Sequence, residues 1–210
     1  MGTPEYTLPQ ALELFHHIGL DGAEIVVQDG YRCAIPQQAD LDELNSLRRQ
    51  ADKLGLRIIA LTPYYSRFND LSSQVREKEI DGLTQVIGYA KVMGAEFIRI
   101  YAGNFAQGEA DPSGEKRQVL VDSMRLLGDR AAEYGIKLVM ENHFNTMTVS
   151  AADSISLAQE INHPAVGILY DQANLTFTNN EPWNQALPLQ FSKVYYTHVK
   201  DLVFRDGCRT

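Results

Sequence analysis

The chain has 210 residues, of which 44% are hydrophobic and 22% are charged, and its formal net charge is −8 at pH 7. This composition is typical of a globular protein that can bury a sizeable core. The excess of acidic residues argues against nucleic acids and anionic membranes as partners, because proteins bind both through clustered Lys and Arg side chains. We therefore expect a small-molecule partner.

The cysteines and the N-terminal segment bear on the cellular setting. Cys33 and Cys208 lie in no pair or metal motif, so we expect neither a disulfide framework nor a thiolate metal site. Residues 1–6 contain no basic segment followed by an apolar run, and the longest apolar runs are far shorter than a membrane span. We expect a cytoplasmic protein that neither binds nor spans a membrane.

Four junctions between a helix and a strand organise most of the chain. In each, a helical segment stops at a glycine and an apolar segment follows almost at once. The junctions are Ile18-Gly19, Leu54-Gly55, Met93-Gly94 and Tyr134-Gly135. Glycine suits this position because it adopts a positive φ without a Cβ clash. A fifth helix is expected to end at Asn162-His163-Pro164, since proline prevents continuation.

Six short strands are predicted after these helix ends. They span residues 23–27, 57–62, 96–101, 137–141, 166–171 and 193–198. The strands are rich in β-branched residues and several are apolar on both faces, which is typical of parallel strands covered on both sides. The segments between them carry helix signals, such as the N-cap spacing of Asp40 with Glu43 and of Ser150 with Asp153. The pattern predicts a repeated βα architecture.

The last residues of three successive predicted strands are the main indication of function. These residues are Glu141, Asp171 and His198. Parallel strands present their carboxyl ends at one edge of a sheet, so the three side chains are expected to meet. Two carboxylates and an imidazole suit one divalent cation. Taken singly, each carboxylate could instead cap the following helix or pair with an arginine.

Alternating strands and helices form either an open doubly wound sheet or a closed barrel. No G-x-G-x-x-G motif follows a predicted strand, which argues against the dinucleotide-binding open form. Candidate ligands at three strand ends favour a TIM (β/α)8-type barrel, in which the loops at the carboxyl ends converge. Because such a barrel usually needs about 250 residues, we expect one incomplete barrel domain over residues 1–210. It is either truncated at both ends or closed by association with another chain.

Five short motifs occur in the order and at the spacing of a known family. They are Gly22-Ala23-Glu24-Ile25, Ile98-Arg99-Ile100-Tyr101-Ala102-Gly103, Met140-Glu141-Asn142-His143, Tyr170-Asp171-Gln172-Ala173-Asn174 and His198-Val199-Lys200-Asp201. On these motifs the chain resembles the xylose isomerase-like TIM barrels, which include sugar phosphate isomerases and epimerases, ketose 3-epimerases, hydroxypyruvate isomerases and inosose dehydratases. The resemblance implies that barrel strands two to seven are visible, whereas strands one and eight are not found.

The resemblance also implies a cofactor, one divalent ion such as Mn²⁺, Mg²⁺, Co²⁺ or Zn²⁺. In the family a Glu, an Asp, a His and a second Glu on the eighth strand hold this ion. The first three correspond to Glu141, Asp171 and His198, and residues 199–210 contain no Glu that could be the fourth.

The implied activity is that of a metal-dependent sugar isomerase or epimerase. It would act on a small ketose, polyol or hydroxy-carbonyl compound by proton transfer beside a carbonyl, with Glu141 as both ligand and candidate base. One alternative is an inosose dehydratase-like lyase, which removes the same proton and then loses water. A second alternative is a non-catalytic, truncated barrel that forms a homo-oligomer.

Eight further residues are candidates for binding the substrate or supporting the ligands. They are Arg99, His143, Asn174, Lys200, Asp201, Arg205, Tyr64 and Trp183. Arg99 is expected to hold Glu141, with an ordinary ion pair as the alternative. The two aromatic residues could pack against the C–H surface of a sugar.

Asn174 and Glu24 are two further residues of interest. Asn174 lies where ketose 3-epimerases look to carry a substrate-binding His, which counts against that branch. For Glu24, within or at the mouth of the barrel, we expect a structural role.

Overall fold

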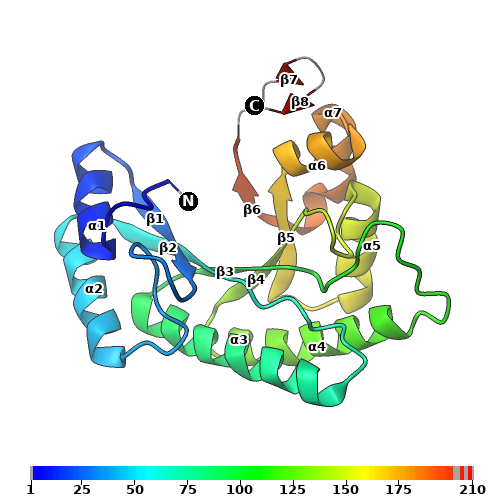
Figure 1. Cartoon of the computed structure of the whole chain (residues 1–210), viewed down its shortest axis with the longest axis horizontal. Coiled ribbons are helices and arrows are strands. Elements are labelled where there is room, and N and C mark those ends of the chain that lie inside the picture. The colour runs from blue at the N-terminus through cyan, green and yellow to red at the C-terminus, as the bar shows by residue number, and fades with distance from the viewer. Residues whose placement is uncertain (1, 201–203, 206–207, 210) are drawn as a thin grey trace.

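Six parallel strands form one curved sheet, and their order in the sheet is their order along the chain (Figure 1). They are β1 (Gly22–Val27), β2 (Arg57–Pro63), β3 (Phe97–Ile100), β4 (Lys137–Glu141), β5 (Val166–Asp171) and β6 (Val194–His198). The computed structural model describes residues 2–200, 204–205 and 208–209. Within these residues β1 and β6 are edge strands that do not pair with each other, so the sheet is an incomplete barrel. The predicted fold class is confirmed, and each strand lies within one residue of its predicted bounds.

Helices follow the strands and surround the outer side of the curved sheet (Figure 1). They are α1 (Leu8–His17), α2 (Leu41–Lys53), α3 (Ser73–Met93), α4 (Glu115–Ala132), α5 (Ala151–Ile161), α6 (Gln172–Asn179) and α7 (Trp183–Gln190), with the short 3₁₀ helix η1 (Phe191–Lys193) before β6. A two-stranded hairpin of β7 (Phe204–Arg205) and β8 (Cys208–Arg209) follows β6. No helix in the described part of the chain has the length and apolar character that crossing a membrane requires.

The predicted start and stop signals set the helix boundaries. The side chains of Asp40 and Ser150 accept hydrogen bonds from backbone N–H groups at the starts of α2 and α5, which satisfies donors that the helix itself leaves free. At the end of α3, Gly94 adopts a φ of 67°. A Cβ there would meet the guanidinium end of Arg48, a flexible side chain that can shift, so the positive φ is what favours glycine.

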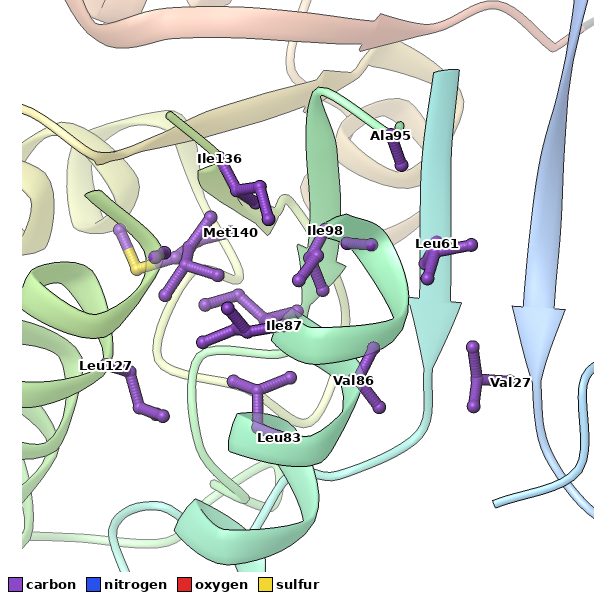
Figure 2. Close-up of a cluster of buried hydrophobic side chains, with 14 of the residues drawn as sticks. Val27, Leu61, Leu83, Val86, Ile87, Ala95, Ile98, Leu127, Ile136 and Met140 are labelled. Atoms are coloured by element: carbon purple, nitrogen blue, oxygen red, sulfur yellow. The ribbon is translucent and has the colours of Figure 1, made fainter. Parts of the chain in front are cut away.

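The core between the sheet and its helices holds the strands in register. Leu83 and Ile87 of α3 lie close to Ile98 of β3, and further buried side chains, Val86 among them, extend the cluster to both sides (Figure 2). Leu83, Ile87 and Ile98 are each at most 1% exposed. Burying one of them contributes roughly 1.5–3 kcal/mol. This packing fixes where the carboxyl ends of the strands lie.

Candidate metal centre and active site

Glu141, Asp171 and His198 are the last residues of the adjacent strands β4, β5 and β6. One potential ligand atom of each lies within 4.8 Å of the other two. Nδ1 of His198 is 3.5 Å from Oε1 of Glu141 and 3.5 Å from Oδ2 of Asp171. The carboxylates are buried, with 4% and 0% of their residue surfaces exposed. The strand ends thus bring the three predicted ligands together.

The His198 imidazole supplies a test of whether these residues fit a cation. Its Nδ1 atom is buried and has no hydrogen-bond partner among the described residues, although leaving a buried polar atom unpaired costs about 1–3 kcal/mol. The same atom faces the two carboxylates. An imidazole nitrogen and two carboxylate oxygens facing one another are a donor set for a divalent transition metal. The residues therefore fit the cation that the sequence predicts.

Asp171 serves the fold as well as the site. Its Oδ1 accepts a hydrogen bond of 3.0 Å from the backbone N–H of Asn174 and caps α6. Its Oδ2 accepts a hydrogen bond from Nζ of Lys200. Burial raises the pKa of Asp171, but the nearby His198 imidazole and the hydrogen bonds from Lys200 and the Asn174 backbone outweigh it and lower the pKa to about 2. The two interpretations of a strand-end carboxylate, helix cap and ligand, are compatible here.

Neighbouring side chains hold Glu141 in place. Nε of Arg99 lies 3.4 Å from Oε2, so the expected pairing of these two residues is present. Nδ2 of Asn174 donates a 3.2 Å hydrogen bond to Oε1, and the Thr148 hydroxyl donates to the Glu141 backbone carbonyl. Arg99 itself is 4% exposed and lies over the Tyr101 ring, 4.2 Å from its centroid. These contacts restrict the carboxylate to one orientation.

Glu24 orients His198 from the opposite side of the site. Nε2 of His198 donates to the Glu24 carboxylate at 3.0 Å, across 174 residues of sequence, and the Thr62 hydroxyl donates to the same carboxylate at 3.1 Å. This contact directs Nδ1 toward Glu141 and Asp171. Burial lowers the pKa of His198, but the three carboxylates outweigh it and raise the pKa to about 11.

Sequence reasoning missed this role of Glu24. The signal was present, because Glu24 is the one charged residue in the apolar strand Gly22–Val27. Burial raises its pKa, yet the hydrogen bonds and charge of His198 leave the pKa below its ordinary value.

A cavity of about 390 Å³ adjoins these residues and has the size of a small-molecule site. We call it the inner cavity. Its lining includes Tyr64, Arg99, Tyr101, Glu141, His143, His198 and Lys200. Nδ1 of His143 lies 2.8 Å from the carbonyl oxygen of Phe144, and a donor at Nδ1 leaves Nε2 as the free acceptor of the neutral ring. The predicted candidates Tyr64, His143 and Lys200 thus line one cavity with two of the predicted ligands.

The remaining candidates lie elsewhere. Asn174 supports Glu141 and is not part of the cavity lining. Trp183, the first residue of α7, is 67% exposed and outside that lining, so its contact with a substrate stays a prediction. Asp201 and the side chain of Arg205 lie outside the described residues.

Comparison with known proteins agrees with this geometry. A family model described as xylose isomerase-like TIM barrel matches residues 12–209. The chain belongs to this family. It is 24% identical over 201 residues to a 3-dehydroshikimate dehydratase of Pseudomonas putida and 27% identical over 160 residues to an inosose dehydratase of Geobacillus thermodenitrificans. These matches cover 93% and 71% of this chain but only 29% and 53% of the relatives.

A solved structure shows the same fold. The chain superposes on a D-psicose 3-epimerase with a TM-score of 0.80 at 13% sequence identity, covering 98% of this chain and 72% of that one. Family members are therefore enzymes that include epimerases and dehydratases.

Proposed function

We propose that the site removes a proton beside the carbonyl of a small polyhydroxylated ketone, and that the product forms by loss of water. The convergence of Glu141, Asp171 and the unpaired Nδ1 of His198 carries this proposal. The dehydratases among the relatives favour this lyase chemistry over the isomerase or epimerase that the sequence motifs suggested first.

Glu141, Asp171 and His198 would hold the divalent cation. When bound, it supplies a Lewis acid that polarises a carbonyl and stabilises the negative charge that develops as the neighbouring carbon loses a proton. Glu24 keeps the imidazole turned so that Nδ1 faces the cation site. Arg99 adds positive charge at the wall of the inner cavity.

His143 is the better placed of two groups that could accept the proton. Glu141, the base suggested by the family resemblance, is held by Arg99 and Asn174 and would serve as a ligand. His143 lines the same cavity and keeps one ring nitrogen free when Nδ1 donates to the Phe144 carbonyl. We assign the base to Nε2 of His143.

The reaction balances without a further reagent. Nε2 of His143 takes the proton from the carbon beside the carbonyl, and the electron pair of that C–H bond forms a carbon–carbon double bond. The C–O bond of the β-hydroxyl then breaks, and the proton held by His143 leaves with this hydroxyl as water. The substrate loses the elements of one water molecule.

The experiment is product analysis by mass spectrometry after incubation of the Mn²⁺-loaded protein with 3-dehydroshikimate or with inosose. We expect a product lighter by one water. If the product were instead an epimer of unchanged mass, the protein would be an epimerase and the proposed lyase activity would be wrong.

Two variants separate binding from chemistry. H143Q should lower kcat by about 10²–10⁴-fold and leave Mn²⁺ binding intact, whereas E141Q should lose both. H17Q, the same change at an exposed position of α1 outside the cavity lining, is the matched control with unchanged kcat. An H143Q variant with undiminished turnover would return the role of base to Glu141.

A further inference from the structure

A second cavity lies beside the inner one at the same end of the sheet. We call it the outer cavity; its volume is about 540 Å³. It is lined by the loop after β3, the loop after β4 and α6, the helix that directly follows β5. These segments follow the carboxyl ends of three neighbouring strands, the end that also carries Glu141 and Asp171. The outer cavity is therefore on the functional face of the barrel.

A continuous row of aromatic rings connects the two cavities. Centroid distances along it are 6.2 Å from Tyr64 to Tyr101, 4.7 Å from Tyr101 to His143, 4.2 Å from His143 to Phe144 and 6.4 Å from Phe144 to Phe177. The first three rings line the inner cavity and the last two line the outer cavity. The stacked pair of His143 and Phe144 is thus a shared wall.

The lining of the outer cavity is aromatic and neutral. Phe144 and Phe177 are 39% and 43% exposed, so two large apolar rings face solvent in a concave site. The amide side chains of Gln107 and Asn145 are also part of the lining. Among the described residues that line it, Glu109 is the one charged side chain and it is paired with Lys116, so none of these residues offers a positive charge to an anion.

We propose that the outer cavity is a second binding subsite for a neutral sugar ring. The C–H faces of such a ring pack against aromatic side chains, and its hydroxyl groups match amide donors and acceptors. Since none of the described lining residues is cationic, the cavity favours a neutral ring over a phosphorylated or carboxylated one. The subsite binds a sugar ring without catalysing a reaction. The test of this proposal therefore does not depend on whether the proposed reaction is correct.

The experiment is saturation-transfer NMR on the full chain with methyl β-D-glucopyranoside as probe. We expect binding to wild type, weakened at least about fivefold in F177A and retained in F177Y, which keeps the ring. Y64A, in the inner cavity, and F191A, at a 69% exposed position outside the lining of both cavities, should bind as wild type does. Thermal unfolding of each variant checks that the fold is intact.

Three results would contradict the proposal that the outer cavity binds a neutral sugar ring. The first is a lack of probe binding to wild type. The second is equal binding to F177A and wild type, or a loss in Y64A instead, since the probe would then occupy another site. The third is tighter binding of glucose 6-phosphate or benzyl alcohol than of the glucoside, which would assign the cavity to an anion or a purely apolar ring.

Discussion

The two sides of the candidate metal centre are built differently. On one side, Glu141 and Asp171 end the central strands β4 and β5, and every residue of β5 is buried. On the other side, His198 ends the edge strand β6, whose residues are half-buried or exposed. Packing fixes the first side from all directions, whereas the second depends on one polar contact between His198 and Glu24 of the opposite edge strand β1.

Hydrogen bonding repeats this contrast. The buried side has a closed network in which the Asn142 side chain accepts from the Asp171 backbone N–H and donates to Ser154 and Gln190. On the open side Glu24 lies behind the imidazole, and the hydroxyls of Thr62 and Tyr196 bond to its carboxylate. Substitutions on the buried side should therefore affect both stability and cation binding, and those on the open side chiefly cation binding.

The largest effect is expected for D171N on the buried side. The amide keeps the size of the side chain and an oxygen that can cap α6, but it removes a ligand charge and the pairing with Lys200. Affinity for Mn²⁺ should fall by about 100-fold or more, and the free energy of unfolding by about 1–3 kcal/mol. Isothermal titration calorimetry and urea denaturation measure the two quantities.

D129N is the matched control for that experiment, because Asp129 has 77% of its side chain exposed and pairs with His163 away from the site. It should leave Mn²⁺ affinity unchanged. Equal affinities for D171N and wild type would remove Asp171 from the metal centre.

E24Q tests the open side and should have the next largest effect. Without its charge, residue 24 holds the His198 imidazole less firmly, so Mn²⁺ affinity should fall by about 10–100-fold. The free energy of unfolding should change little, because the Glu24 side chain is 25% exposed. E96Q changes the same residue type before β3, at the other end of the sheet where Glu96 pairs with Arg57, and should not alter affinity. A large loss of stability in E24Q with unchanged Mn²⁺ affinity would contradict the proposed difference between the buried side and the open side of the site.

Local patterns explain why most of the fold was predictable. Short apolar segments and glycine stops depend on neighbouring residues only, and they located all six strands of the sheet. A helix was expected between β5 and β6, but its bounds were not predicted, because α6 begins directly after Asp171 without a linker and α7 contains Pro188. Both features run against the usual signals for a helix.

The site was predictable only where it follows strand ends. Glu141, Asp171 and His198 come together because adjacent parallel strands end at the same edge. The contact of Glu24 with His198 depends on the curvature of the whole sheet, which brings the two edge strands together, and no local pattern encodes it. Trp183 is 67% exposed and outside the lining of the inner cavity, since nearness in sequence to a strand does not determine which way a helix turns its side chain.

N174A should have the smallest effect and tests how redundant the buried side is. The change removes the 3.2 Å hydrogen bond to Oε1 of Glu141 and the 2.9 Å hydrogen bond to the Asn142 carbonyl. The backbone N–H of residue 174 still donates to the Asp171 side chain, which caps α6. The free energy of unfolding should fall by about 1 kcal/mol, and Mn²⁺ affinity by less than about tenfold, because Arg99 still holds the carboxylate. N45A removes a side-chain hydrogen bond within α2 and is the matched control. If N174A lost as much affinity as D171N, a single amide rather than the packed network would hold Glu141.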